Sequence, residues 1–140
     1  ILDSTLKIPL HSQVLHDSNV LIATTTKANK EKKKILTKQG ISILVFDGEN
    51  IPLHKLLAKL KEKEIISVLV EGGGKTLGSF LDERLVDKVY AFYAPILIGG
   101  NNAINAIGGK GVKTIQQSLR LKNLFYKKFD DNLLTVGYPI

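Results

Sequence analysis

The strongest constraint on the fold is the alternation of short apolar runs with helical patterns along much of the chain. Apolar runs at residues 20–23, 41–46 and 67–71 predict buried strands, because each run is short and bounded by polar or glycine residues. Between them, residues 27–39 and the leucine-rich segment 53–60 show the spacing of helices. Strands that alternate with helices pair in parallel through crossover connections. This part of the chain therefore predicts an α/β fold.

Residues 76–85 continue this alternation as a further helix, and residues 88–98 follow as a strand that Pro95 interrupts. We therefore expect residues 88–98 to pair in parallel as well. The last part of the chain has a different pattern. A loop rich in glycine and asparagine follows, to which we assign no chemistry. Two strand-like runs at residues 121–129 and 133–138 are then separated by a three-residue turn of Asp and Asn. They predict an antiparallel hairpin.

Length and composition exclude several classes of protein. A chain of 140 residues has the size of one domain, so we expect residues 1–140 to form a single domain. No run approaches the roughly 20 apolar residues of a membrane span. With no cysteine in the sequence, disulfides and thiolate nucleophiles are excluded and a cytoplasmic location is expected. The three histidines form no metal-binding pattern, so we predict no metal site, and no residue is assigned as catalytic.

The charge of the chain leaves two kinds of anionic partner open. Its net charge of +7 would attract either nucleic acid or phosphorylated small molecules. A cluster of lysines supports the first reading: Lys27, Lys30, Lys32, Lys33 and Lys34. No aromatic residue that could stack on a base lies among them, so we interpret the cluster as the solvated face of a helix. A basic nucleic-acid-binding module stays as an alternative that nothing else in the sequence favours.

Three consecutive glycines, Gly72 to Gly74, lie between a predicted strand and the start of a predicted helix. Free backbone N–H groups and the positive end of the helix dipole meet at such a junction, which favours binding of a phosphate. The segment is not a P-loop, because Leu69 stands where the first glycine is required. It is not the Rossmann fingerprint either, because Leu77 stands where the third glycine would fall. A nucleotide phosphate site of another fold is predicted.

Glu71 directly precedes these glycines, at the carboxyl end of the predicted strand. A carboxylate at this position can accept hydrogen bonds from the hydroxyl groups of a ligand, since ligands of α/β sheets bind at the carboxyl ends of strands. It can equally cap a helix or pair with a surface cation. The residues alone leave both readings open.

Three segments resemble one family. The run VLVEGGGKTLGSFLDERLVDKVYAFYAPILIGG, the opening ILDSTLKIP and the C-terminal hairpin are similar to the C-terminal reductase domain of the bifunctional riboflavin biosynthesis proteins, the RibD family. The most specific parts are the glycine turn, the helix and strand start at residues 79–87 and the A-P-x-L-x-G run at residues 94–99.

The resemblance implies a fold similar to dihydrofolate reductase, with a mostly parallel central sheet, flanking helices and an antiparallel C-terminal hairpin. It also implies NADPH-dependent reduction of 5-amino-6-(5-phosphoribosylamino)uracil, a phosphorylated pyrimidine, to its ribityl form. A reductase of the same fold with another substrate is the alternative. A homodimer is the oligomeric state that the resemblance suggests, with a deaminase domain in the same parent chain. The family's domain begins some tens of residues earlier, so we expect residues 1–140 to be an N-terminally truncated piece that is a poor catalyst alone.

The resemblance also implies roles for individual residues. Ser4 and Lys7 would lie at the adenosine 2′-phosphate of the cofactor, and Glu71 would face the ribose of the substrate. The pyrophosphate would be held by Gly73, Gly74, Lys75, Thr76, Leu77, Gly78 and Ser79.

Overall fold

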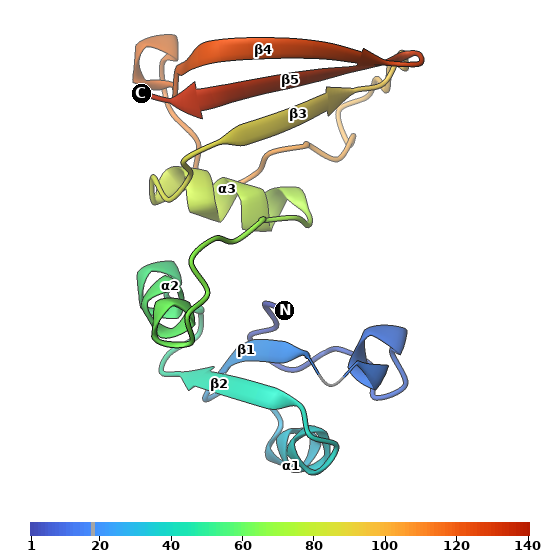
Figure 1. Ribbon diagram of the computed structural model, residues 1–140, viewed down its shortest axis with the longest axis vertical. Coiled ribbons are helices and arrows are strands. Elements are labelled where there is room, and N and C mark those ends of the chain that lie inside the picture. Colours follow the sequence, from blue (N-terminus) through green and yellow to red (C-terminus); the bar gives the residue numbers. More distant parts are fainter. Residues whose placement is uncertain (18) are drawn as a thin grey trace. The chain divides into compact units, whose positions relative to one another are not determined.

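The computed structural model describes residues 1–17 and 19–140, which form two compact units, Ile1–Ile66 and Ser67–Ile140 (Figure 1). The elements of the first unit are the 3-10 helix η1 (Gln13–His16), β1 (Leu21–Thr25), α1 (Lys30–Lys38), β2 (Ser42–Phe46) and α2 (Leu53–Glu62). The elements of the second unit are α3 (Gly74–Asp82), β3 (Val89–Tyr93), the 3-10 helix η2 (Ile115–Gln117), β4 (Leu121–Phe129) and β5 (Asn132–Pro139).

The first unit is built on the parallel strands β1 and β2, which pair from Leu21 with Ser42 to Thr25 with Phe46. Leu2 adds a parallel bridge to Ala23, so the chain start runs alongside β1. Ile1 and Leu2 are partly exposed, whereas the central residues of β1 are buried. The core consists of buried apolar side chains from the strands and from α1: Leu6, Leu15, Val20, Ile22, Leu36 and Ile41. The predicted parallel pairing is confirmed.

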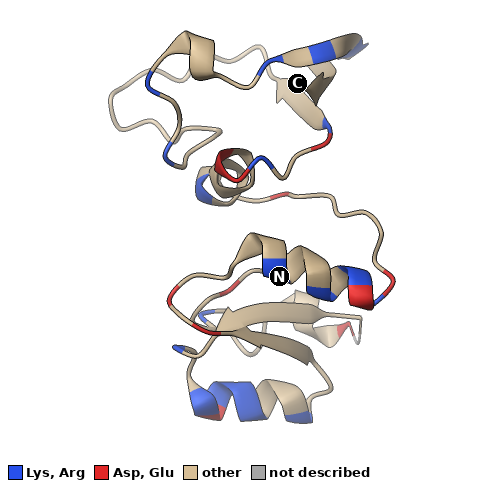
Figure 2. Cartoon of the chain, turned by 90° about the vertical axis from the view of Figure 1, so that its left-hand side faces the viewer, with Lys and Arg blue, Asp and Glu red and all other residues tan. Residues whose placement is uncertain are grey.

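Helix α1 connects β1 to β2. It begins at Lys30, later than the predicted residue 27, because Asn29 caps it by accepting a hydrogen bond from the N–H of Lys32 at 3.0 Å. Gly40 follows the helix with φ +84°, as its predicted place after the helix end requires. Leu36 points into the core with 0% exposure, and basic residues occupy much of the rest of the helix (Figure 2). The interpretation of the lysine cluster as a largely solvated helix face agrees with this arrangement.

Helix α2 begins directly after Pro52, whose fixed backbone angle suits the start of a helix. Leu53 and Leu56 are buried, and polar residues alternate with them. The predicted amphipathic helix is therefore confirmed.

The second unit contains an antiparallel sheet of order β3-β5-β4. The parallel pairing expected for residues 88–98 was wrong, because β3 pairs antiparallel with a strand of the C-terminal hairpin, β5, and not with β1 or β2. The predicted hairpin is confirmed as β4 and β5, although Phe129 pairs with Asn132 and the turn therefore has two residues rather than three. Asp130 adopts φ +48° there, a conformation that Asp tolerates better than most residues. Strand β3 ends at Tyr93, short of the predicted end at residue 98, because Pro95 has no N–H to donate to a ladder.

One predicted strand and one predicted helix end in the second unit were also wrong. Residues 67–71 form no strand, because they take part in neither of the two sheets of the described chain. Helix α3 also ends at Asp82 rather than at residue 85. Its end is a Schellman motif, in which Arg84 has φ +54° and the N–H of Leu85 bonds to the carbonyl oxygen of Phe80 at 2.9 Å. The α/β class is confirmed, with the strands divided between a parallel and an antiparallel sheet.

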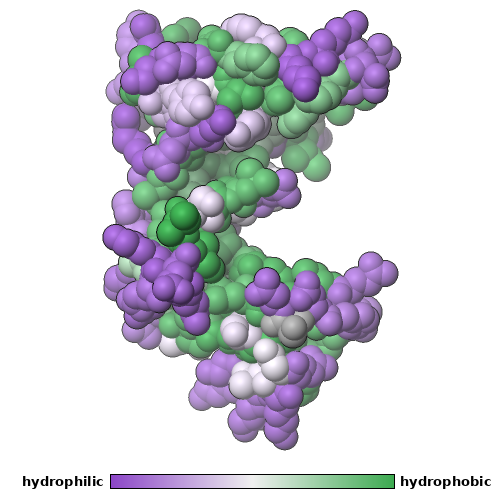
Figure 3. Space-filling view, viewed as in Figure 1, coloured by the Kyte–Doolittle hydropathy of each residue, from purple (hydrophilic) through white to green (hydrophobic). Residues whose placement is uncertain are grey.

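Large apolar side chains are exposed on the antiparallel sheet. The register places Tyr90 and Phe125 on one face, because both pair with Val136. Phe92 on the same strand as Tyr90 is 66% exposed and lies 6.3 Å from the ring of Phe129. Figure 3 shows apolar residues at the surface of this unit. No helix of the described residues is long and apolar enough to cross a membrane.

Candidate functional site

The N-terminus of α3 has the backbone geometry of an anion-binding site. Gly73 is the N-cap residue and supplies no side chain, and Gly72 before it adopts φ +143°, which a residue with a Cβ rarely reaches. Among the described residues, the backbone N–H groups of residues 72–75 donate to no acceptor. The first N–H bonded at this end is that of Thr76, to the carbonyl oxygen of Gly73 at 2.9 Å. Unbonded donors at the positive end of a helix dipole form a site for a phosphate oxygen.

The glycines of this segment differ in what surrounds them. A Cβ at Gly73 would meet no heavy atom within 4 Å. A Cβ at Gly74 would lie 2.6 Å from the carbonyl oxygen of Asn105, and one at Gly78 would overlap the backbone of Gly108. Gly74 and Gly78 are therefore required by the packing of a loop, whereas the space beside Gly73 is open.

The loop after β3 docks on α3 through backbone groups. Gly108 donates its N–H to the carbonyl oxygen of Gly74 at 2.8 Å. At the other end of the helix, the carboxylate of Asp82 accepts hydrogen bonds from the N–H groups of Lys110 at 2.6 Å and Gly111 at 3.1 Å. Sequence reasoning assigned this loop no role and missed Asp82. Two signals could have found the contact, namely the paired glycines at residues 108 and 109 and an acidic residue at the end of the helix.

The other residues predicted to hold the pyrophosphate lie on α3, and they differ in whether their polar groups already make hydrogen bonds within the helix. Lys75 is exposed and Thr76 is half-buried in the first turn, close to the unbonded N–H groups. Further along, the N–H of Leu77 bonds to the carbonyl oxygen of Gly73 at 3.3 Å. The hydroxyl of Ser79 donates to the carbonyl oxygen of Lys75 at 2.9 Å. The helix itself therefore uses these groups of Leu77 and Ser79, and the open donors belong to residues 72–75.

Glu71 is exposed and lies next to the glycine turn, although the strand predicted to end at it is absent. Its carboxylate makes no hydrogen bond or ion pair with any residue in the described part of the chain. Gly73, the N-cap residue, has no side-chain cap. The capping and ion-pairing alternatives therefore find no support, and the carboxylate is accessible to a ligand.

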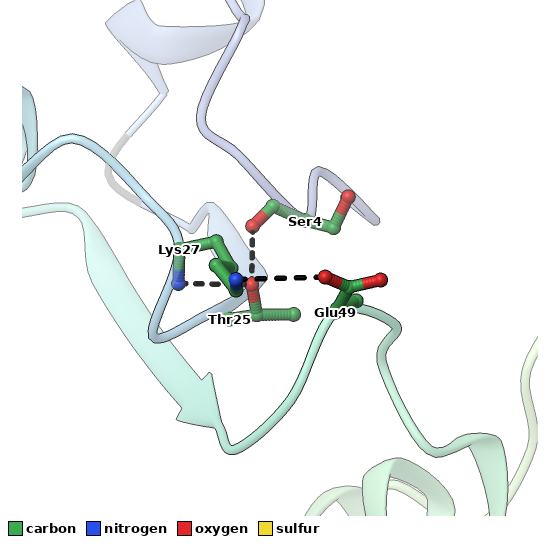
Figure 4. Close-up of polar contacts among 4 residues, drawn as sticks. All are labelled: Ser4, Thr25, Lys27 and Glu49. Atoms are coloured by element: carbon green, nitrogen blue, oxygen red, sulfur yellow. Dashed lines mark hydrogen bonds and ion pairs between the residues drawn. The ribbon is translucent and has the colours of Figure 1, made fainter.

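Ser4 lies in the first unit, at the carboxyl end of β1. Its carbonyl oxygen accepts hydrogen bonds from the hydroxyl of Thr25 at 2.8 Å and from the N–H of Thr25 at 3.1 Å. The hydroxyl of Thr25 also accepts from the N–H of Lys27 at 3.2 Å (Figure 4). Lys7 is exposed three residues beyond Ser4. The structure therefore brings Ser4 together with Thr25 and Lys27, two residues that the sequence interpretation did not assign to a site.

Residues 1–17 and 19–140 contain no group of three or more His, Asp or Glu side chains that could hold a metal ion. The open donors at residues 72–75 are neutral N–H groups, which bind anions and not cations. The chemistry of the donor set therefore fits the phosphate groups of a dinucleotide.

A parallel strand pair joined through a crossover helix, a glycine turn into α3 and a C-terminal antiparallel hairpin define an α/β domain of the dihydrofolate-reductase-like class. Within that class, residues 1–135 match the model of the RibD C-terminal domain, and the chain belongs to this family.

Relatives and solved structures agree with the family. The chain is 35% identical over 134 residues to the riboflavin biosynthesis protein RibD of Aquifex aeolicus, which covers 96% of the chain and 36% of that protein. It is 33% identical over 121 residues to the 2,5-diamino-6-ribosylamino-4(3H)-pyrimidinone 5′-phosphate reductase of the same organism, covering 85% of the chain and 54% of that protein. The structure of Acinetobacter baumannii RibD is similar with a TM-score of 0.84 and 27% identity, covering all of the chain and 37% of that structure. The chain thus spans about a third to a half of the length of these proteins.

Proposed function

We propose that this domain reduces the ribosyl group of 5-amino-6-(5-phosphoribosylamino)uracil to a ribityl chain with NADPH, as a step of riboflavin biosynthesis. The observation that carries the proposal is the α3 N-terminus, where N–H groups without an acceptor surround the open position of Gly73 in a RibD C-terminal domain. Reduction of a sugar carbon needs a hydride donor, and the described residues include no cysteine that could supply electrons.

In this proposal the protein supplies binding and orientation. NADPH, when bound, supplies the hydride. The N–H groups of residues 72–75 hold its pyrophosphate, with the side chains of Lys75 and Thr76 beside them. Leu77, Gly78 and Ser79 shape the helix and the loop docked on it, which is a narrower role than direct contact. Gly74 contributes its N–H group and also allows that loop to approach the helix. Ser4 and Lys7 lie at the 2′-phosphate, and Glu71 accepts hydrogen bonds from the ribose hydroxyls of the substrate.

The proposed partners follow from the family and from the surface. We propose a cytoplasmic location for the protein. We also propose that it forms a homodimer, because the aromatic side chains exposed on the antiparallel sheet, among them Tyr90, Phe92 and Phe125, form an apolar face that favours association. A deaminase domain in the same natural chain is also proposed, since the chain matches about a third of the RibD relative of Aquifex aeolicus.

A second substrate is favoured by one specific observation. The reductase of Aquifex aeolicus, which the chain matches over 54% of its length, is named for reduction of 2,5-diamino-6-ribosylamino-4(3H)-pyrimidinone 5′-phosphate. This compound also carries a ribosylamino group and a 5′-phosphate. The same glycine turn and the same Glu71 could serve either compound. Selectivity between the two substrates must therefore come from contacts to the pyrimidine ring.

The experiment uses the full-length protein, meaning the natural chain that carries residues 1–140. NADPH oxidation is followed with each of the two pyrimidine phosphates, and the ribityl product is identified by mass spectrometry. We expect turnover of the uracil compound to exceed that of the diamino compound. The reverse preference would select the second substrate, and a ribityl product from neither would refute the proposed function. Dihydrofolate serves as a control substrate of a reductase with the same fold.

A further inference from the structure

The carboxyl ends of the parallel segments in the first unit meet at one edge. Thr25 ends β1, Phe46 ends β2, and the segment at Leu2 is bridged to β1 in parallel. The pairing continues one step past the strands, since the N–H of Thr26 bonds to the carbonyl oxygen of Phe46 at 2.9 Å. Ligands of α/β sheets bind outside the carboxyl ends of strands. The side chains that follow these ends are therefore candidates for ligand contact.

Thr25 joins two of these chain segments. Its side chain is 1% exposed, and its hydroxyl donates to the carbonyl oxygen of Ser4 while it accepts from the N–H of Lys27. A buried hydroxyl with both donor and acceptor satisfied holds its partners in one arrangement. The backbone of Lys27 is thereby fixed next to that of Ser4.

The ammonium group of Lys27 already has an anionic partner. It lies 3.5 Å from a carboxylate oxygen of Glu49, in the turn after β2 (Figure 4). Both side chains are exposed, at 61% and 81%, so solvent screens the pair and little free energy holds it together. A phosphate monoester carries more negative charge than a carboxylate and offers three acceptor oxygens. A phosphate at this edge would therefore displace Glu49 from Lys27.

We infer that Lys27 binds the 2′-phosphate of NADPH and that Glu49 competes for the same ammonium group, so that the pair sets the discrimination between NADPH and NADH. The inference rests on the proposed function and deepens it, because it assigns cofactor specificity to two residues beyond Ser4 and Lys7. Lys7 differs from Lys27 in having no ion pair with any described residue. The carboxylate of Glu49 opposes binding of the phosphate and leaves binding of NADH, which lacks that phosphate, unaffected.

The test measures dissociation constants of the full-length protein for NADPH and NADH at low ionic strength. Adenosine 2′,5′-bisphosphate and adenosine 5′-phosphate serve as fragment probes that differ only in the 2′-phosphate. Lys27→Gln should weaken binding of NADPH and of the bisphosphate about tenfold, the effect of losing one charge-assisted hydrogen bond. The same substitution should change the dissociation constants of NADH and of adenosine 5′-phosphate by less than about twofold. Glu49→Gln should strengthen NADPH binding about threefold with NADH unchanged, because only a weak surface pair is released.

The matched control is the ion pair between Lys34 and Glu31 on α1, which has a similar length of 3.6 Å and similar exposure. Lys34→Gln removes the same charge and should change NADPH binding by less than about twofold. An equal loss in Lys34→Gln and Lys27→Gln would reduce the effect to net charge and overturn the inference. So would a Lys27→Gln variant that loses NADPH and NADH alike, or a Glu49→Gln variant with unchanged discrimination. If the unmodified protein bound neither dinucleotide, the proposed function itself would fail.

Discussion

Gly108 donates its backbone N–H to the carbonyl oxygen of Gly74 at 2.8 Å, so the loop after β3 is hydrogen-bonded to the first turn of α3. One helical turn further on, a Cβ at Gly78 would overlap the backbone of Gly108. Backbone approaches backbone here, which only glycine permits. The contact explains Gly74 and Gly78 by packing, whereas a Cβ at Gly73 would meet no atom within 4 Å.

Gly78→Ala should detach the loop from α3. The added methyl group has only the rigid backbone of Gly108 to displace, and overpacking of this kind costs about 1–3 kcal/mol. Lys110, whose N–H is held by Asp82, should then become a faster site of tryptic cleavage, measured by limited proteolysis and mass spectrometry. Gly99→Ala is the control, because a Cβ there meets no atom within 4 Å. Equal cleavage rates in the two variants would contradict the docking of the loop.

Gly73→Val should abolish NADPH binding without disturbing the fold. Gly73 has φ −74° and ψ 162°, which valine adopts readily, and its Cβ would project into open space. The branched side chain would cover the N–H groups that we propose hold the pyrophosphate. Far-UV circular dichroism should match that of the parent, while titration calorimetry detects no NADPH binding. Gly99→Val provides the comparison, and an unchanged NADPH affinity in Gly73→Val would refute the cofactor site.

Glu71→Gln should affect the substrate and spare the cofactor. The amide keeps the size of the side chain but removes the negative charge and replaces one of the two acceptor oxygens with an NH2 donor. We expect kcat/KM for the pyrimidine to fall about tenfold or more, with little change in the dissociation constant of NADPH. Glu64→Gln, at another exposed position, controls for charge. A parallel loss for both ligands would indicate that Glu71 supports the turn and does not contact the substrate.

Thr24→Val should stabilise the first unit. The hydroxyl of Thr24 is fully buried and has no hydrogen-bond partner within the described chain. Replacing an unsatisfied buried hydroxyl with a methyl group should raise the free energy of unfolding by about 1 kcal/mol. The neighbouring Thr25→Val should lower it by about 1 kcal/mol, because that hydroxyl donates to Ser4. The urea midpoints of the two variants are compared, and a shift of both in the same direction would rule out this explanation.

Local features of the sequence predicted the elements whose residues interact mainly with near neighbours along the chain. Gly40 marked the end of α1 because a left-handed residue is needed there. The hairpin of β4 and β5 was recognisable from two apolar runs around a polar turn. The glycine turn and Glu71 were recognised from the sequence itself, and the family resemblance added their roles. Among the described residues, the N–H groups of the turn and the carboxylate of Glu71 have no hydrogen-bond partner. Their roles as ligand contacts stay predictions.

Only the tertiary structure decided the features that depend on contacts distant in sequence. Residues 67–71 have the composition of a strand, yet a strand exists only where another segment pairs with it, and none of the described residues does. Glycine is needed at position 78 because the backbone of Gly108, about thirty residues away, packs against it. The role of Asp82 is visible only in the folded chain, where its carboxylate accepts hydrogen bonds from the N–H groups of Lys110 and Gly111. Apolar pattern and turn chemistry are local and can be read from the sequence, whereas the partner of an exposed N–H or the space beside a glycine is set by chain segments that meet only in the folded molecule.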